Sequence, residues 1–325
     1  MIGLSGLGHV LMVFWSGSFG SPFAFFSGTL LRATPLLFLG LGVSLSFRAG
    51  LLNIGADGQF LIGAAAAAAV ALDSGSAPHV AVVIGMLLAG SLAGCAWAGI
   101  AAQLRRRFGV LEVISTLLLN FVALYLVAWL VRGPLQEPTH IYPQSSSFSS
   151  SAHWPLLLRG QRLHLGFAVA MALSVALWWI LRSTATGFRV RAVGANAPAA
   201  ASAGSIDIER TIFGVFLASG ALAGLGGAAE VGGLTWALYE GISPGYGYTA
   251  IAVALLARLD MRGVVLTAIF IGALQAGGAA MERDAGIPSA VVSIAIALAV
   301  LGTLAGARGR EMLAARSHRI RTVPT

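Results

Sequence analysis

Long apolar runs recur along the whole of this sequence and limit its fold more than any other feature. Hydrophobic residues make up 57% of the 325 residues and charged residues only 10%, whereas a soluble domain carries roughly 25% charged residues. Only helices and closed barrels satisfy the backbone in a bilayer, and these runs lack the period-2 alternation of barrel strands. The sequence therefore predicts an all-α, polytopic transmembrane helical bundle that forms one domain over residues 1–325.

Nine candidate spans can be placed, with edges good to about three residues. Two of them are shorter than the roughly 20 residues that a crossing helix needs, so we expect two broken or re-entrant segments among about nine spans. The short segments are the second and seventh in the following order: 33–47, 60–72, 79–101, 111–131, 164–181, 211–229, 248–257, 263–280 and 288–306.

The positions of the arginines orient the bundle. All 20 basic residues are arginine. With the C-terminal tail 307–325 in the cytosol, alternate threading leaves only five arginines outside, which is the asymmetry of the positive-inside rule. The excess of basic residues is therefore a topology signal and does not indicate nucleic-acid binding. We expect a multi-pass protein of a bacterial inner membrane with a cytosolic C-terminus; the five outer arginines are Arg32, Arg132, Arg159, Arg162 and Arg283.

The same threading places two long polar segments on opposite sides of the membrane. The loop 132–163 falls outside, and its many Pro and Ser residues suit either a polar cap over the mouth or a disordered surface loop. The loop 183–210 falls in the cytosol. The N-terminus falls outside, an unusual arrangement that a span upstream of this sequence, or a partial span over 7–26, would repair.

The cytosolic loop 183–210 contains the pattern of a short helix. Asn196 is placed as the N-cap, Pro198 falls in the first turn where its missing N–H is harmless, and Gly204 ends the helix. A plain solvated connector between two spans is the alternative interpretation of this loop.

Each short span follows a polar stretch interrupted by glycine, NIGADGQ at 53–59 and SPGYGYT at 243–249. Broken helices in corresponding positions of two halves point to a pathway at mid-membrane depth. They suggest a weak internal repeat with halves near 33–131 and 164–280. Asp57 lies inside the first stretch, where it could cap the half-helix that follows or line the pathway directly.

Polar residues on span 111–131 form a stripe on one helical face, because their spacings are 3, 1 and 4 residues. In a bundle such a face points to a neighbouring helix or to a water-filled path, so helix-to-helix hydrogen bonding stays open as the alternative. The candidate pathway residues are the stripe and the first broken stretch: Asn53, Gly55, Asp57, Gln59, Glu112, Ser115, Thr116 and Asn120.

Three carboxylates and four glycines near the spans have simpler interpretations. Glu112, Glu230 and Glu240 lie toward span ends, where we expect interfacial solvation. The glycines of span 211–229 and its end predict close helix packing. They are Gly220, Gly224, Gly226 and Gly227.

The sequence offers no set of residues for catalysis. The chain has no lysine and therefore cannot contain the G-x-x-x-x-G-K-[ST] phosphate loop of an ATPase. Its six histidines show no metal-ligand spacing, and the single cysteine, Cys95, suits a small buried apolar residue. We expect a chain that is not an enzyme and holds no metal or cofactor, so that any ATPase is another polypeptide.

Five segments, taken in order, are similar to a known family. They are FRAGLLNIGADGQFLIGA (47–64), EVISTLLLNFVALYLV (112–127), GFRVRAVGANAPAAASAG (187–204), SGALAGLGGAAEV (219–231) and GYTAIAVALLARLDMRGV (247–264). This order resembles the inner-membrane permeases of ATP-binding-cassette (ABC) importers in the branched-chain amino acid, ribose and nucleoside group, and most of all the nucleoside, or simple-sugar-like, type.

The resemblance implies that the chain imports a nucleoside or a related small polar ring compound, or, within the family, a simple sugar, a branched-chain amino acid or a flavin. The implied partners are a cytosolic ATPase, a second homologous permease or a second copy of this chain, and an extracytoplasmic binding protein or lipoprotein. Membrane lipid surrounds the bundle. A secondary carrier or channel, with Asp57 or Glu112 handling a coupling ion, is the rival function.

The resemblance also assigns the loop 183–210 to coupling with the ATPase, through a short helix that docks in a groove of that subunit. Two departures from the family pattern stand out: Asp57 replaces a usual Glu, and Asp260-Met261 replaces a usual Asn-Pro, which predicts a less rigid start for the next helix. The residues that match the coupling pattern are Arg191, Ala192, Val193, Gly194, Asn196, Ala199, Ala200 and Gly204.

Overall fold

The computed structural model describes residues 4–202 and 206–288, together with 290–291, 293–294, 297–298 and 301–302. Over this described part, the regular elements are helices and no strand forms. They are α1 (Leu4–Ser18), η1 (Ala24–Leu30), α2 (Leu31–Arg48), α3 (Ala56–Leu72), α4 (His79–Phe108), α5 (Glu112–Arg132), η2 (Ser150–Ala152), α6 (Leu165–Ser183), α7 (Ala185–Ala195), α8 (Ala197–Ser202), α9 (Ile208–Glu230), η3 (Val231–Thr235), α10 (Tyr246–Leu256) and α11 (Met261–Ala285).

Six of the helical stretches in the described part are long and apolar enough to cross a membrane. They are Ala24–Arg48, His79–Phe108, Glu112–Arg132, Leu165–Ser183, Ile208–Thr235 and Met261–Ala285, while Ala56–Leu72 and Tyr246–Leu256 are shorter apolar helices. The prediction of a multi-pass helical bundle with two short segments is thus confirmed. The ninth expected span, 288–306, lies largely outside the described residues.

The bundle is packed most closely where α9 meets α3 and α4. A Cβ atom added to Gly224 would collide with the backbone of Gly90, and one added to Gly220 would collide with the carbonyl oxygen of Gly94. A Cβ on Gly227 would meet the carbonyl oxygen of Phe60 on α3. Glycine at these positions lets the backbones touch, so the predicted close packing of this helix is confirmed.

The loop 132–163, which we call the outer loop after its predicted side of the membrane, packs against residues 232–238 as an ordered cap. Its backbone N–H groups at Ser145, Phe148 and Trp154 donate to carbonyl oxygens of residues 232–238, over distances of 2.7 to 2.9 Å. The Trp154 side chain is only 2% exposed. Of the two alternatives for this loop, the packed cap is confirmed and the disordered loop is wrong.

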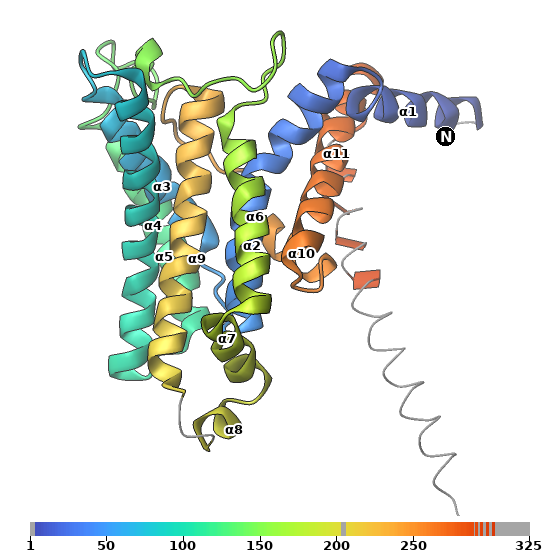
Figure 1. Ribbon diagram of the computed structural model, residues 1–325. Coiled ribbons are helices and arrows are strands. Elements are labelled where there is room, and N and C mark those ends of the chain that lie inside the picture. Colours follow the sequence, from blue (N-terminus) through green and yellow to red (C-terminus); the bar gives the residue numbers. More distant parts are fainter. Residues whose placement is uncertain are drawn as a thin grey trace, which may run out of the picture.

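Figure 1 shows the outer loop and the α7–α8 pair at opposite ends of the bundle, as their predicted placement on opposite sides of the membrane requires. The predicted short helix is α8, and Asn196 caps it by accepting a hydrogen bond of 3.0 Å from Ala199 N. Pro198 lies in its first turn, whereas Gly204 lies outside the described residues.

The loop 183–210 contains a second helix that the sequence did not predict, because Ala185–Ala195 form α7. Thr184 starts this helix by accepting a hydrogen bond of 3.1 Å from Gly187 N. A Cβ on Gly187 would also collide with Ile180 and Leu181 at the end of α6. Sequence hydropathy missed α7 because the helix is only 11 residues long and has no marked apolar face.

Candidate functional site

Asn53 holds the non-helical break between α2 and α3 from the inside. Its side chain is fully buried. The Oδ1 atom accepts hydrogen bonds from Gly55 N (2.9 Å) and Gln59 Nε2 (3.1 Å), and Nδ2 donates to Gln59 Oε1 (3.2 Å) and to Ser219 Oγ on α9 (3.0 Å). Both polar atoms of the amide have partners. The backbone can therefore be non-helical inside an apolar bundle without leaving its polar groups unpaired.

The polar stripe of α5 closes the same break from the other side. Thr116 Oγ1 accepts a hydrogen bond from Ile54 N (3.3 Å). Asn120 accepts from Gly58 N (2.8 Å) and donates to Ile54 O (2.9 Å). These side chains replace the helical partners that the break removes, so the interpretation of the stripe as helix-to-helix hydrogen bonding is confirmed for Thr116 and Asn120.

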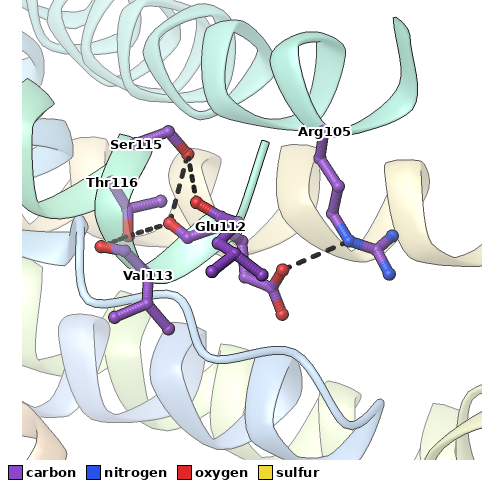
Figure 2. A network of polar contacts seen from close by, with 6 residues as sticks. Arg105, Glu112, Val113, Ser115 and Thr116 are labelled. Atoms are coloured by element: carbon purple, nitrogen blue, oxygen red, sulfur yellow. Dashed lines mark hydrogen bonds and ion pairs between the residues drawn. The ribbon is translucent and has the colours of Figure 1, made fainter. Parts of the chain in front are cut away.

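Ser115 and Glu112 do not reach the break. Figure 2 shows Ser115 Oγ donating back to the carbonyl oxygen of Glu112 (3.2 Å), while the Glu112 carboxylate faces Arg105 Nε at 3.3 Å. The Glu112 side chain is 18% exposed. The expectation that solvent alone stabilises this carboxylate was therefore wrong, because an arginine of α4 pairs with it.

Asp57 links the two interrupted segments. Its Oδ1 atom accepts a hydrogen bond of 2.7 Å from Ser243 Oγ and one of 2.8 Å from Gly247 N, in the first turn of α10. No side chain caps α3 at Gly55. The expectation that Asp57 caps its own half-helix was wrong, because the carboxylate crosses to the start of the other half-helix, where free N–H groups and the helix dipole favour an anion.

The two starts approach so closely that only glycine fits at position 247. A Cβ on Gly247 would lie 2.6 Å from Asp57 Cβ and 2.7 Å from Asp57 Cα. Ser243 Oγ also accepts from Gly245 N (3.2 Å) and Tyr246 N (3.1 Å), which begins α10. We call Asn53, Asp57, Asn120, Ser243 and Gly247 the joint.

The joint reaches the outside of the bundle at Tyr248. Its hydroxyl lies 3.4 Å from Asn120 Nδ2, and the residue is 45% exposed. Sequence reasoning flagged SPGYGYT as a stretch but assigned no role to its members. The serine before Pro-Gly and an apolar run was a helix-start signal. No local sequence pattern indicated the roles of Gly247 and Tyr248.

The side chains of the joint are suited to connecting helices to one another. Among the described residues, no group of three or more His, Cys, Asp or Glu side chains could hold a metal ion. The joint instead combines two half-helix starts, one carboxylate between them and amide partners on α5 and α9. Such an arrangement holds irregular backbone at membrane depth and can change shape when one hydrogen-bonded contact shifts.

The α7–α8 pair contacts the same region from the end of α2. A Cβ on Gly194 would collide with the carbonyl oxygen of Arg48, and Gly50, which has a φ of +78°, lies within 4 Å of Gly194. Gly194 thus places α7 directly against the residues where the α2–α3 break begins.

The other predicted coupling residues divide by exposure. Asn196 and Ala199 are exposed, and Arg191 and Ala192 are half-buried. Val193 and Ala200 are buried at 4% and 5% exposure. The pair therefore has one face anchored in the bundle and one face free, as a docking element needs.

The two outer glutamates differ from each other. Glu240 pairs with Arg132 across the outer end of α5, with 2.9 Å between Oε2 and Arg132 Nε. Glu230 is only 4% exposed, and its nearest polar partner is the Tyr246 hydroxyl at 3.5 Å. Interfacial solvation was the wrong expectation for Glu230, because the residue is buried.

Asp260 anchors the helix that follows α10. Its Oδ1 atom accepts from Arg262 N (2.9 Å) and Gly263 N (3.1 Å), which caps α11. Burial opposes its ionisation, but the hydrogen bonds from Gly263 and Arg262 outweigh burial and lower the pKa of Asp260. The carboxylate therefore supplies the cap of α11, while the lower rigidity expected from the replacement of Asn-Pro stays a prediction.

Comparison with known proteins places this geometry in a family. The family model described as branched-chain amino acid transport system / permease component matches residues 25–305, which include the joint and the α7–α8 pair.

Individual relatives cover most of the chain. The glucose ABC transporter permease protein TsgB13 of Haloferax volcanii is 43% identical over 84% of this chain and 74% of its own length. The guanosine ABC transporter permease protein NupP of Bacillus subtilis is 38% identical over 88% of this chain and 82% of its own length. The nucleoside ABC transporter permease protein NupB of Lactococcus lactis is 29% identical over 83% and 76%.

Proposed function

Because this chain belongs to the family of permease components of branched-chain amino acid transport systems, we propose that it imports nucleosides or a related small polar ring compound as the permease subunit of an ATP-driven importer. The family match over 25–305 carries the class. The substrate class is supported by relatives named for glucose, guanosine and nucleosides, all of which present a hydroxyl-bearing ring. A simple sugar, a branched-chain amino acid or a flavin is the alternative cargo.

ATP hydrolysis belongs to a separate cytosolic subunit in this proposal. The chain has no lysine, so it lacks the phosphate-binding loop of an ATPase. The docking element is the free face of α7–α8, with Asn196 and Ala199 exposed. Small side chains at that face let the backbone of a partner approach closely.

A chain of contacts connects α8, the proposed ATPase-docking helix, to the two broken helices. Movement of α8 reaches Gly194, which abuts Arg48 at the end of α2. The α2–α3 break begins there, and its far end carries Asp57, which holds the start of α10. A displacement at the ATPase would therefore change the contact between the two half-helices rather than deform a straight span.

The substrate path in this proposal runs beside the joint, between this chain and a second permease. Tyr248 and Leu52, at 45% and 48% exposure, lie on the surface next to the two breaks. Two short helices, six long ones and the segment 288–306 make up the nine spans, with the C-terminus in the cytosol. On the outer side the ordered cap would receive a binding protein or lipoprotein that delivers the substrate.

Co-purification and uptake test the function together. We expect the tagged chain to bring down an ATPase subunit, and the complex in proteoliposomes to take up radiolabelled guanosine only when ATP and the binding protein are present. Glucose serves as the competing substrate, because a glucose permease is among the relatives. Uptake without ATP, or no associated ATPase, would overturn the proposal, while preference for glucose would overturn the nucleoside assignment alone.

The coupling assignment has its own test on one exposed face. Ala199→Leu enlarges an exposed residue of α8, and Ala185→Leu makes the same change at an exposed residue at the start of α7. We expect Ala199→Leu to weaken the ATPase association and Ala185→Leu to leave it unchanged. Equal behaviour of the two variants would contradict docking through α8.

A secondary carrier is the rival function and predicts a different energy source. In the structure, Asp57 Oδ1 accepts hydrogen bonds from Ser243 and Gly247, and Glu112 pairs with Arg105, so a coupling ion would compete with these contacts. Uptake that collapses with an uncoupler but survives ATP depletion would favour the carrier.

A further inference from the structure

A polar cavity of about 390 Å³ lies at the outer end of the molecule, away from the joint. Its walls come from α1, η1, the start of α2, the outer loop and the end of α11. Three guanidinium side chains, Arg32, Arg162 and Arg283, line it against a single carboxylate, Asp284. The cavity therefore carries more positive than negative charge and suits an anionic ligand.

The arginines reach the cavity from three separate parts of the chain. Arg32 Nη1 donates to Gly28 O on its own helix at 3.3 Å. The outer loop is pinned to η1 where Arg162 N donates to Ser27 Oγ (2.8 Å) and Ser27 Oγ donates to Gln161 Oε1 (2.9 Å). These hydrogen bonds place Arg162 at the wall of the cavity. The fold itself therefore brings the three arginines together.

The single carboxylate leaves most of that charge unbalanced. Asp284 pairs with its neighbour Arg283 at 3.4 Å, and the two side chains are 52% and 69% exposed. Arg32 and Arg162 form no ion pair among the described residues, although the charge of the buried Glu230 carboxylate also acts on Arg32. Guanidinium groups bind phosphate oxygens through paired N–H donors, so the cavity matches a phosphate group in charge and geometry.

The rim of the cavity is apolar and aromatic. Phe23 lines the cavity and is 56% exposed. On the neighbouring α1, Trp15 is 62% exposed and Met12 is 70% exposed. Figure 1 shows α1 lying across the upper end of α11 instead of running along the bundle. Exposed aromatic and apolar side chains on a helix in that orientation suit the interface between headgroups and acyl chains.

We propose that this cavity binds the phosphate-bearing headgroup of an anionic phospholipid of the outer leaflet, with its acyl chains against Phe23 and the exposed face of α1. Phosphate is the shared chemistry of a lipid headgroup and a free anion, and the apolar rim favours the lipid. The site is independent of the substrate path, because the joint and the cavity share no residue.

Native mass spectrometry of the full chain tests the site with phosphatidylglycerol as the probe and phosphatidylcholine, a zwitterionic lipid without net charge, as the comparison. We expect retained phosphatidylglycerol to fall about thirtyfold in the double variant Arg162→Gln/Arg283→Gln, because each basic residue near an anionic surface is worth about 1 kcal/mol and each 1.4 kcal/mol is tenfold. Arg159→Gln is the matched control, since Arg159 lies in the same exposed loop but does not line the cavity.

Three results would overturn the proposal. Equal retention of phosphatidylglycerol by the double variant and the control would show that the arginines do not hold lipid. Competition by inorganic phosphate at concentrations comparable with the lipid would identify a free-anion site. Loss of affinity for the binding protein, with lipid retention unchanged, would identify a protein docking surface. The single variant Arg162→Gln, at an exposed loop side chain, keeps the test valid if the double variant folds poorly.

Discussion

The two interrupted helices are built differently, although both start near the middle of the bundle. The start of α3 is held on two sides, by Asn53 bonded to Ser219 of α9 and by Asn120 of α5 bonded to Ile54 and Gly58. The start of α10 is held to α3 by hydrogen bonds to one carboxylate, Asp57, and by contact of the Tyr246 ring with Phe60. Because more buried hydrogen bonds hold the α3 side, we propose that it is the fixed half of the joint and that the α10 side is the half that shifts.

The difference also extends to the packing behind each helix. α3 and α9 meet backbone to backbone, where Gly63 faces Gly224. Beyond its first turn, where Gly247 lies against the Asp57 backbone, α10 meets α2 through side chains, with Val253 against Gly40, and leaves Tyr248 45% exposed. Close backbone contact resists sliding, whereas side-chain contacts at an exposed face can rearrange. Substitutions in the fixed half should thus affect stability, and substitutions at the link should affect transport.

The largest effect on stability is expected for Gly224→Ala. The added Cβ would collide with the Gly90 carbonyl oxygen, and overpacking of this kind costs about 1–3 kcal/mol or more. Thermal unfolding of the detergent-solubilised protein measures it. The matched control is Gly214→Ala on the same helix, whose added Cβ meets no atom within 4 Å; equal melting temperatures for the two variants would contradict a fixed α9–α3–α4 core.

The largest effect on transport is expected for Asp57→Ala. It removes the acceptor of Ser243 Oγ and Gly247 N, and a buried group left unpaired costs about 1–3 kcal/mol. We expect ATP-dependent uptake to fall about tenfold or more while the protein still folds, with Asp57→Asn intermediate because one acceptor oxygen remains.

Asp73→Asn is the control for that experiment. Asp73 is exposed and follows the other end of α3, so its change should leave uptake intact. Normal uptake by Asp57→Ala would contradict the role of Asp57 in transport, because it would show that the link between the half-helices is dispensable.

A smaller effect on uptake is expected for Gly194→Ala, since this change acts through the end of α2. The added Cβ would press on the Arg48 carbonyl oxygen and displace α7. ATP hydrolysis by the assembled complex should continue while uptake falls several-fold, which a paired measurement of phosphate release and uptake detects. Parallel loss of both activities would indicate failed assembly instead of lost coupling.

The smallest effect is expected at Asp260, which caps α11 behind the movable half. Its folded-state pKa is lowered, so its contribution to stability is present above the unfolded-state pKa of about 3.8 and is lost as the pH falls through the lower folded value. The difference in melting temperature between the wild type and Asp260→Ala should be constant from about pH 5 to 8 and shrink below about pH 4. A difference that grows toward acid would contradict the cap.

Much of this molecule could be predicted where the governing interactions are local. Apolar run length gave the helices, the Asn-Ala-Pro pattern gave the cap of α8, and clustered glycines gave the close face of α9. The polar spacing on α5 gave the face that carries Thr116 and Asn120, although it could not tell which of its members reach the break.

What the sequence could not supply depends on distant partners. Asp57 and Gly247 are 190 residues apart, so a rule for helix caps assigned the carboxylate to the nearest helix start. Glu230 is buried in the folded chain, and its side-chain partner, the Tyr246 hydroxyl, lies 16 residues further along the sequence. α7 was missed because a short helix without a marked apolar face lacks the long apolar run that identifies a span.

Electron paramagnetic resonance distances test the central claim, that the α10 side moves against a fixed α3–α5 side. The single cysteine, Cys95, is first replaced by alanine, and spin labels are placed at Leu118→Cys with either Ala252→Cys on α10 or Leu92→Cys on α4. Leu118 and Leu92 are 58% and 66% exposed, so labels there disturb no packing. In the assembled complex, trapping ATP should shift the 118–252 distance beyond the width of its resting distribution and leave the 118–92 distance unchanged. A shift in the 118–92 distance with a constant 118–252 distance would contradict the account.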